Sequence, residues 1–483
     1  MAREFSSQLA SNSIFGVVQK ASKHLGVDSY IVGGYVRDLI LQRSSKDIDF
    51  VCIGSGISLA KEVSKQLGPG AKLSVFKNFG TAAIHFAGFE YEFVGARKES
   101  YRSDSRKPLV EDGTLEDDQN RRDFTINALA ISLNEGSYGA LIDPFNGMDD
   151  LRSMMIRTPL APDVTFSDDP LRMMRAIRFA SQLHFDIDPD TFDGIINQID
   201  RIKIVSQERI TDELNKIILS PKPSYGFKLL FHSGLLKYIF PEMVKLQGVE
   251  KINGKSHKDN FYHTLEVLDN ISEMTEDLWL RWAAILHDIA KPATQRFNTK
   301  VGWTFHGHED LGAKWVPKIF QRMKLPMDDR MRYVQKLVRL HLRPIALVND
   351  HVTDSAVRRM VFEAGNDVGD LMTLCKADVT SKNPEKVKKY QANFVKVEAK
   401  IKEVEDRDRV MNFNPPVTGE QIIETFQIEP SKVVGDIKAE IKEAILDGKI
   451  KNDEQQALEL MLKIGKAKGL TINHKIISTS SDK

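Results

Sequence analysis

The spacing of hydrophobic residues changes near residue 150. Residues 5–25 have apolar positions on a helical spacing, which predicts one amphipathic helix. Residues 98–120 are polar and charged, without periodicity, which predicts a mobile loop. Short strand-like apolar runs lie at 30–32, 47–53, 73–76, 82–86 and 91–96. From Leu151 onward the spacing is helical almost without interruption. We therefore predict an α+β protein, in which a small mixed α/β domain precedes an all-helical remainder.

Composition sets limits on this picture. The 483 residues exceed the usual size of one domain, and 41% hydrophobic and 28% charged residues are typical of globular proteins. No apolar run approaches the roughly 20 residues that cross a bilayer, and the first residues lack an apolar signal segment. Cys52 and Cys375 lie far apart, as expected in a reducing compartment. We expect a cytoplasmic protein, without a membrane or an obligate protein partner. A net charge of +1 neither supports nor excludes nucleic acid.

A pair of carboxylates is the strongest chemical signal. Asp47 and Asp49 lie at positions i and i+2 of a predicted strand, so their side chains point to the same face. Such a pair can hold two divalent cations, one to activate an attacking hydroxyl and one to neutralise a leaving pyrophosphate. The preceding turn, Gly33-Gly34, allows a triphosphate to approach the backbone closely. This combination predicts nucleotidyl transfer with Mg²⁺.

A third acidic residue is expected on the strand at 91–96. Glu92 is the candidate for a further carboxylate near the metal ions, and Glu90, on the same face, is its rival. The alternative is that Glu92 is an exposed strand residue without a catalytic role. Asp47, Asp49 and Glu92 are therefore the predicted catalytic residues.

Two segments further along the chain carry groups that suit a nucleotide. Arg122 and Asp123 can hold phosphates and a ribose hydroxyl, and Asn127 can add a polar contact, although a salt-bridge cluster at a helix start is equally compatible. Asp169 and Arg172 lie three residues apart at a helix start and are therefore neighbours. A carboxylate and a guanidinium together can accept cytosine and adenine and refuse uracil and guanine, without a template strand. A capping aspartate in an ion pair is the alternative.

In this order, the motifs resemble the class II CCA-adding enzyme and bacterial poly(A) polymerase family. The shared elements are Gly33–Asp49, Arg121–Ala128, Asp143–Leu151 and Asp168–Arg172, with Asp168 standing where glutamate is usual. The resemblance implies four parts, a nucleotidyltransferase head at 1–150, a helical neck for base selection and RNA binding at 151–245, an HD domain at 246–390 and a helical tail at 391–483. The nucleotide-binding residues are expected to be Gly33, Gly34, Arg37, Arg122, Asp123, Asn127, Asp168, Asp169, Arg172 and Arg175.

Histidines recur in the second helical block. Histidine is the commonest transition-metal ligand, and its apolar surroundings here predict burial, which demands a partner. The series resembles an HD-domain metal site that takes a divalent transition metal. The resemblance implies His263, His287, Asp288 and Asp378 as core ligands, with His308 and His341 available to a second ion. HD domains in related enzymes are associated with phosphodiesterase and phosphatase action; an inactive, structural HD fold is the alternative.

The predicted function is the template-independent addition of CCA, from CTP and ATP, to the 3′ end of tRNA. The segment at 98–120 resembles the loop that the family uses to add the terminal A. The open alternatives are an A-adding or poly(A)-adding enzyme, an HD phosphohydrolase whose head only binds nucleotides, and an RNA-binding module in which both sites are silent. The candidate contacts to RNA phosphates are Arg175, Arg178, Arg358, Arg359, Lys382, Lys386, Lys388 and Lys389.

Overall fold

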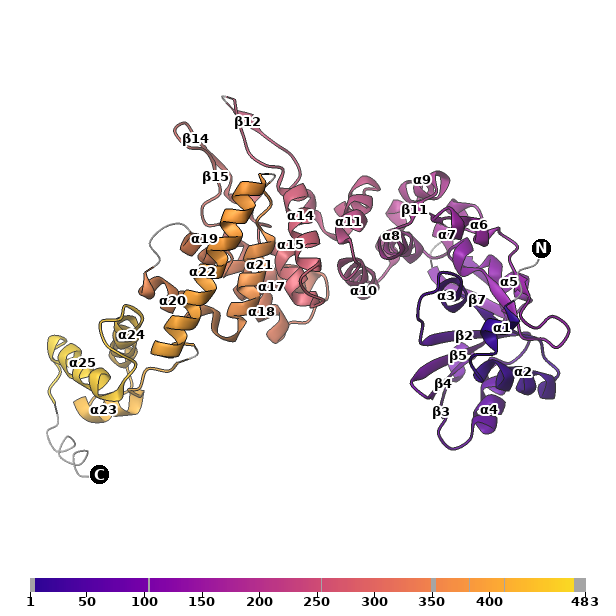
Figure 1. The fold of residues 1–483 in the computed structure, drawn as a ribbon, viewed down its shortest axis with the longest axis horizontal. Helices are drawn as coiled ribbons and strands as arrows, with labels where there is room; N and C mark the ends of the chain where they lie inside the picture. The colour runs from indigo at the N-terminus through magenta and orange to yellow at the C-terminus, as the bar shows by residue number, and fades with distance from the viewer. Residues whose placement is uncertain are drawn as a thin grey trace. The chain divides into compact units, whose positions relative to one another are not determined.

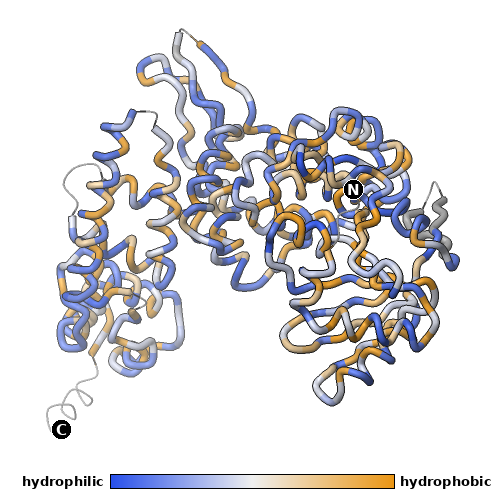
Figure 2. Tube along the Cα trace, turned by 45° about the vertical axis from the view of Figure 1, so that its right-hand side comes forward, coloured by the Kyte–Doolittle hydropathy of each residue, from blue (hydrophilic) through white to orange (hydrophobic). Residues whose placement is uncertain are grey.

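The computed structural model describes residues 5–102, 105–252, 254–348, 353–381, 383–411 and 413–472. The chain divides into two compact units, Met1–Pro241 and Glu242–Lys483. Hydrophobic and hydrophilic positions alternate along the helices of both units (Figure 2), as expected for helices that bury one face. None of the helices in these ranges combines the length and the apolar character that a membrane crossing requires.

A seven-stranded sheet forms the centre of the head in the first unit (Figure 1). The strand order is β3-β4-β5-β2-β1-β8-β9, in which β2 and β5 are parallel and the other neighbours antiparallel. The strands are β1 (Ser29–Val32), β2 (Asp47–Cys52), β3 (Lys72–Phe76), β4 (Thr81–Phe86), β5 (Phe89–Gly95), β8 (Ala130–Ser132) and β9 (Leu141–Ile142).

Helices cover one face of this sheet. Helix α2 (Ile14–Leu25) packs against α4 (Gly56–Leu67), and both contact the strands. Phe15 of α2 meets Phe50 of β2, which stacks on Phe93 of β5 with ring centroids 5.0 Å apart. Burial of these aromatic rings fixes which side chains of β2 and β5 point away from α2. The other short elements of the head are α1 (Ser6–Leu9), α3 (Gly34–Ile40), η1 (Lys77–Phe79), β6 (Arg97–Arg102), β7 (Ser105–Asp112), α5 (Leu115–Asn120), η2 (Thr125–Asn127) and α6 (Gly147–Arg152).

The neck follows the head within the same unit and is almost entirely helical. Helix α8 (Leu171–Leu183) is its central element, because it contacts α7, α10, α11 and the small parallel pair of β10 and β11. Nine of its thirteen residues are buried. The other elements are β10 (Met155–Ile156), α7 (Pro162–Asp168), β11 (Asp186–Ile187), α9 (Pro189–Asn197), η3 (Ile199–Ile204), α10 (Gln207–Ile218), α11 (Pro223–His232) and α12 (Leu235–Ile239).

The second unit is helical apart from two hairpins that lie side by side and project from it (Figure 1). The hairpins are β12 (Lys251–Ile252) with β13 (Lys255–Ser256), and β14 (Arg296–Asn298) with β15 (Gly302–Thr304). Its first helices are α13 (Pro241–Val244), α14 (Asn260–Ser272), α15 (Leu278–Leu286), α16 (Lys291–Thr294), α17 (His308–Arg322), α18 (Asp329–Leu340) and α19 (Leu342–Val348). The later ones are α20 (Asp354–Ala364), η4 (Gly365–Asp367), α21 (Val368–Ala377), α22 (Pro384–Asp408), α23 (Gly419–Phe426), α24 (Lys432–Leu446) and α25 (Glu454–Ala467).

The predicted α+β architecture, a mixed head before helical parts, is confirmed, but two local predictions were wrong. Residues 5–25 form two helices, because Asn12 accepts a hydrogen bond from the backbone of Ile14 and starts α2 afresh. The segment at 98–120 is not a loop: β6 and β7 form an antiparallel hairpin, and Thr114 begins α5 with a capping box. Backbone pairing and caps need no apolar periodicity, so the hydropathy pattern missed them.

Candidate active site and histidine centre

Carboxylates gather on the face of β2 and β5 that points away from α2. In the parallel register Asp47 lies opposite Glu90, and Asp49 lies opposite Glu92. Ile48 alternates with the two aspartates and is fully buried on the other face. The structure therefore brings the three predicted catalytic residues together, with Glu90, the rival of Glu92, beside them. We call Asp47, Asp49, Glu90 and Glu92 the carboxylate face.

The electrostatics of the carboxylate face suit a cation. Burial raises the pKa of Asp49, with Asp47 adding to the rise and Arg122 opposing it. Burial likewise raises the pKa of Glu92, and the neighbouring charge of Asp49 raises it further. Negative groups held this close repel one another, and a divalent cation between them relieves that repulsion. Oxygen ligands of this kind fit Mg²⁺.

Gly33 keeps the space beside Asp49 open. Its φ is +74°, a backbone conformation that favours glycine. A Cβ at this position would lie 2.9 Å from Nη1 of Arg122 and 3.2 Å from Oδ2 of Asp49. Gly34 then begins helix α3. The glycine turn, the guanidinium and the carboxylate therefore meet at one place, as a triphosphate site requires.

A chain of hydrogen bonds joins α3 to α8. Nη1 of Arg37 donates to Oδ1 of Asn127 (2.8 Å), and Nδ2 of Asn127 donates to Oδ1 of Asp123 (3.0 Å). Nε of Arg175 donates to Oδ2 of Asp123 (2.7 Å). Burial acts to raise the pKa of Asp123, but Arg175 and the amide of Asn127 outweigh it and hold this pKa at about 2. Four predicted nucleotide-binding residues thus form one charged network.

Asp118 is a site residue that the sequence reasoning missed. Its fully buried carboxylate accepts from both guanidinium groups of the Arg-Arg pair, with Nη2 of Arg122 at 2.9 Å and Arg121 on the other oxygen. Despite burial, Arg122 and Arg121 lower the pKa of Asp118. The sequence signal for these contacts was the position of Asp118, three residues before Arg121 and four before Arg122. Asp118 positions Arg122 next to Gly33 and Asp49.

The predicted base-reading pair lies at the junction of α7 and α8. The buried guanidinium of Arg172 donates to the backbone oxygens of Thr165 (3.2 Å) and Arg121 (2.5 Å). Oδ1 of Asp169 accepts from the backbone of Leu171 (3.1 Å). Asp168 is the last residue of α7 and is half-buried. The geometry shows how Arg172 is held, whereas the role of all three residues in base reading stays a prediction.

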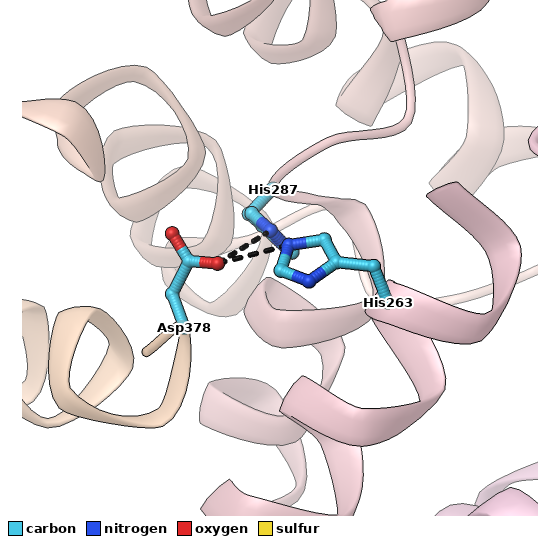
Figure 3. A group of neighbouring side chains, drawn as sticks. All are labelled: His263, His287 and Asp378. Carbon is cyan, nitrogen blue, oxygen red and sulfur yellow. Dashed lines mark ion pairs between the residues drawn. The ribbon is translucent and has the colours of Figure 1, made fainter. Parts of the chain in front are cut away.

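In the second unit, six side chains from five helical segments gather in one place, where four histidines surround Asp288. Oδ2 of Asp288 faces Nε2 of His287 (3.2 Å) and of His263 (3.4 Å), while Oδ1 faces Nε2 of His308 (3.2 Å) and of His341 (3.8 Å). Asp378 approaches His263 at 3.0 Å and His287 at 3.6 Å (Figure 3). Two groups of ligand atoms therefore share Asp288, and we call these six residues the histidine centre.

The hydrogen bonds behind the rings orient the histidines. Nδ1 lies 2.7 Å from a backbone carbonyl in His287, His308 and His341, the carbonyls being those of Ala284, Phe305 and Val338. These contacts place a proton on Nδ1 and point Nε2 into the centre, as in metal-binding histidines. Nδ1 of His263 lies 2.9 Å from Oγ1 of Thr380 instead.

The charges in the centre fit a bound cation. Buried Nε2 of His287 has no hydrogen-bond partner. Burial acts to lower the pKa of His287, but Asp288 and Asp378 raise it to about 10, so the centre attracts positive charge. Burial lowers the pKa of His341, and the neighbouring charge of His287 lowers it further, to about 4, so this ring is neutral. Lys291 contacts Oδ2 of Asp288 (2.5 Å); the sequence reasoning missed it, although it stands three residues after Asp288. The donors suit a divalent transition metal.

The four arginines predicted to contact RNA all form ion pairs within the protein. Arg175 pairs with Asp123 (2.6 Å) and Arg178 with Glu213 (2.7 Å). Arg358 of α20 pairs with Asp408, the last residue of α22 (2.7 Å). Arg359 of α20 pairs with Glu443 of α24 and with Asp447, the residue that follows α24. Lys386, Lys388 and Lys389 are exposed on α22, and Lys382 lies outside the described residues. RNA binding by all eight residues stays a prediction.

Three family models match successive parts of the chain. Residues 29–157 match the Poly A polymerase head domain, residues 184–246 the probable RNA and SrmB-binding site of polymerase A, and residues 260–362 the HD domain. An A-adding tRNA nucleotidyltransferase of Deinococcus radiodurans is 30% identical over 431 residues, which cover 87% of this chain and 92% of that protein. The chain belongs to the tRNA nucleotidyltransferase family. It is accordingly a nucleotidyltransferase by class.

Further members of the family are similar over part of the sequence or in fold. A CCA-adding enzyme of Geobacillus stearothermophilus is 35% identical over 226 residues, 46% of this chain and 53% of that one. The Thermotoga maritima CCA-adding enzyme complexed with tRNA(CCA) has a TM-score of 0.61 at 22% identity, with 96% of this chain and 99% of that chain covered. A tRNA nucleotidyltransferase complexed with a primer tRNA and an incoming ATP analogue has a TM-score of 0.55 at 24% identity, with 79% and 98% covered. These structures share its fold.

Proposed function

We propose that this chain adds C, C and A, from CTP and ATP, to the 3′ end of tRNA without a template strand. The carboxylate face beside Gly33 and Arg122 carries the proposal, because it joins a cation site to a phosphate site. The reaction forms a bond from the 3′ oxygen of tRNA to the α-phosphorus and releases pyrophosphate. The 3′ hydroxyl loses its proton in this step, and the tRNA and the nucleoside triphosphate are the only two reactants.

Asp47 and Asp49 would hold two Mg²⁺ ions, with Glu92 next to them. Ions held at this face would supply the positive charge that activates the attacking hydroxyl and neutralises the leaving pyrophosphate. Gly33 leaves room for the phosphates next to Arg122, whose orientation Asp118 fixes. We expect the hydrogen-bonded network of Arg37, Asn127, Asp123 and Arg175 to contact the ribose and the phosphates.

Base choice would fall to the start of α8. Asp169 offers a carboxylate that accepts from an exocyclic amine, and Arg172 offers guanidinium donors for a ring nitrogen. In the structure two backbone oxygens hold Arg172 in place, and its guanidinium has further N–H donors that can contact a base. An enzyme that selects bases in this way needs no nucleic-acid template.

Addition of A alone is the second candidate for the head. It is favoured by the Deinococcus radiodurans relative, which is similar over most of both chains and is named A-adding. The Geobacillus stearothermophilus CCA-adding enzyme is similar over 226 residues only. Both candidates use the same carboxylate face and differ in whether CTP is accepted.

The histidine centre would give the chain a second activity, metal-dependent hydrolysis of phosphate esters. Its six side chains have their Nε2 and carboxylate atoms in two groups that each suit one divalent ion. Such an ion lowers the pKa of a bound water and polarises a phosphate. The chain supplies ligands whose orientation is already fixed by the carbonyls behind the rings.

Labelled nucleotides distinguish the candidates for the head. The full chain is incubated with Mg²⁺ and either a tRNA that lacks its terminal CCA or one that ends in CC. Incorporation of CTP and then ATP into the first tRNA is expected for CCA addition. Incorporation of ATP into the second tRNA alone identifies an A-adding enzyme. No incorporation into either tRNA, with pure protein and fresh Mg²⁺, overturns both.

A further inference from the structure

A cavity of about 520 Å³ lies in the head, beside the turn that joins β4 to β5. Phe89 and Tyr91 of β5 line it, and because side chains alternate along a strand, they point away from Glu90 and Glu92. Phe86 of β4, which pairs with Phe89, lines the cavity as well. The other walls come from the start of α2, from α3 with the segment after it, and from the last residue of α4. The cavity and the carboxylate face therefore lie on opposite faces of one sheet.

Four aromatic side chains surround this cavity, and three of them are only half-buried. The rings of Phe89 and Tyr91 are stacked, with centroids 6.0 Å apart and an angle of 11° between their planes. Phe86, Phe89 and Tyr35 of α3 are half-buried, so each keeps exposed surface at the cavity. Aromatic surface left open in a hollow of this volume suits a flat apolar group, and any nucleobase can stack on it.

The charge of the cavity suits a single phosphate. Arg43 is the only charged residue among the described residues that line it, and its side chain is exposed. In the described ranges no ion pair or side-chain hydrogen bond engages its guanidinium. One guanidinium can bind one phosphate through two parallel hydrogen bonds, whereas a triphosphate carries more charge than it neutralises.

Polar groups that suit a ribose also line the cavity. Asn12 contributes an amide, and Ser13 and Ser44 contribute hydroxyl groups. Burial raises the pKa of Tyr35 and of Tyr91, so their hydroxyl groups stay protonated and can donate hydrogen bonds. Aromatic rings, neutral polar groups and one cation are together the parts that a nucleoside monophosphate requires.

Two walls of the cavity continue into the segments that carry the predicted catalytic groups. Ser45 lines the cavity, and its Oγ donates to the backbone oxygen of Asp47 (3.1 Å), where β2 begins. Tyr35 directly follows Gly34 of the glycine turn. A ligand in the cavity therefore contacts both segments without entering the space in front of the carboxylate face.

We propose that this cavity is a second nucleotide site of the head, which binds one nucleoside monophosphate and alters the rate of incorporation at the carboxylate face. The base stacks on Phe86 and Phe89, and the phosphate lies on the guanidinium of Arg43. The ligand binds without any covalent step. Its effect on the rate rests on the proposed nucleotidyl transfer, whereas binding in the cavity does not depend on it.

Binding is located by photolabelling the full chain with azidoadenosine monophosphate and identifying the labelled residues by mass spectrometry. The label is expected on Tyr35 or Tyr91, and an excess of adenosine monophosphate should remove it. Arg43→Glu is expected to weaken this labelling about tenfold or more. Phe89→Ala is expected to weaken it about fivefold or more, because a stacking surface is lost.

Two matched variants serve as controls. Lys65→Glu reverses an exposed charge on α4, and Phe76→Ala removes an exposed ring on β3; neither residue lines the cavity. Incorporation of labelled ATP into a tRNA that ends in CC is then measured at saturating ATP, with and without adenosine monophosphate. The rate is expected to change in the wild-type chain and in both controls, and this response should be lost in Arg43→Glu and Phe89→Ala.

The outcomes separate the site from its effect and from the transfer reaction. Labelling that falls only on other residues, or that survives Arg43→Glu and Phe89→Ala as it does the controls, overturns the nucleotide site. Labelling in the cavity without a change in the rate overturns the regulatory effect alone. A chain that incorporates no nucleotide contradicts the proposed transfer, while the labelling still decides the site. Protection by a short RNA with a 5′-phosphate, as well as by the free nucleotide, would show that RNA ends also supply the ligand.

Discussion

Gly33 shows how a residue without a side chain determines the geometry of the head site. It adopts a φ of +74°, and the space where its Cβ would be lies against Arg122 and Asp49. Asp118, fully buried, holds the guanidinium of Arg122 from behind. The head site therefore depends on Asp49, which faces the predicted cation site, on Asp118, which positions Arg122, and on the space left open by Gly33.

Gly33→Ala is expected to slow nucleotide incorporation by about a hundredfold, because the new methyl group displaces Arg122 or Asp49 from its place. Positive φ adds a folding cost of about 1–3 kcal/mol. Gly68→Ala is the control, since Gly68 has a similar backbone conformation (φ 82°, ψ −162°, against 74° and −140° for Gly33) but nothing within 4 Å of a Cβ. Steady-state incorporation of labelled ATP and thermal unfolding are measured for both. Equal losses of activity in the two variants would assign the effect to backbone strain alone.

At the scale of elements, the parallel pairing of β2 with β5 is what makes four acids neighbours. The register places Asp49 opposite Glu92, while the buried ring of Phe50 opposite Phe93 locks that register from the other face. The network from Arg37 through Asn127 and Asp123 to Arg175 likewise ties α3 of the head to α8 of the neck. Elements far apart in sequence are thus joined by buried polar groups.

Asp123→Asn is expected to destabilise the first unit by about 2 kcal/mol at pH 7, from a carboxyl pKa of about 2 in the folded chain against 3.8. A folded pKa below the unfolded one stabilises the fold above pH 4, and that contribution is lost as the pH falls from 4 to 2. The difference between the two proteins should therefore shrink over this interval. Urea unfolding followed by circular dichroism at several pH values measures it.

A surface carboxylate supplies the control for this experiment. Asp149 pairs with Arg152 at 2.6 Å, yet both side chains are mostly exposed. Asp149→Asn should therefore change the free energy of unfolding by well under 1 kcal/mol at every pH. A pH-independent difference for Asp123→Asn would show that its carboxylate is not what stabilises the junction of α3 and α8.

At the scale of the whole molecule, the chain carries two sites of different chemistry in two units. The carboxylate face offers oxygen atoms to a cation in the unit Met1–Pro241, and the histidine centre offers nitrogen and oxygen atoms in the unit Glu242–Lys483. All four tryptophans belong to the second unit, so tryptophan fluorescence reports on that unit alone. The two sites can therefore be disabled and monitored separately.

Asp47→Ala is expected to abolish nucleotide incorporation while leaving the transition-metal content of the dialysed protein unchanged. Asp288→Asn is expected to lower the transition-metal content while leaving nucleotide incorporation unchanged, because Asp288 faces histidines of both ligand groups of the histidine centre. Metal content is measured by mass spectrometry and incorporation by labelled ATP. Unchanged tryptophan fluorescence verifies the fold of the second unit in Asp288→Asn. Incorporation that survives Asp47→Ala would remove this residue from the mechanism.

The sequence alone determined which reactive side chains are present and which of them share a strand, a turn or a helix. Two aspartates on one strand must share a face, a glycine turn must lie before them, and histidines inside apolar helices must find partners. Only the tertiary structure decided which of these groups meet, because contact between β2 and β5, or between α14 and α21, depends on packing across many intervening residues. Asp118 and Lys291 became visible only then. Their roles come from neighbours in space, and no local spacing records those neighbours.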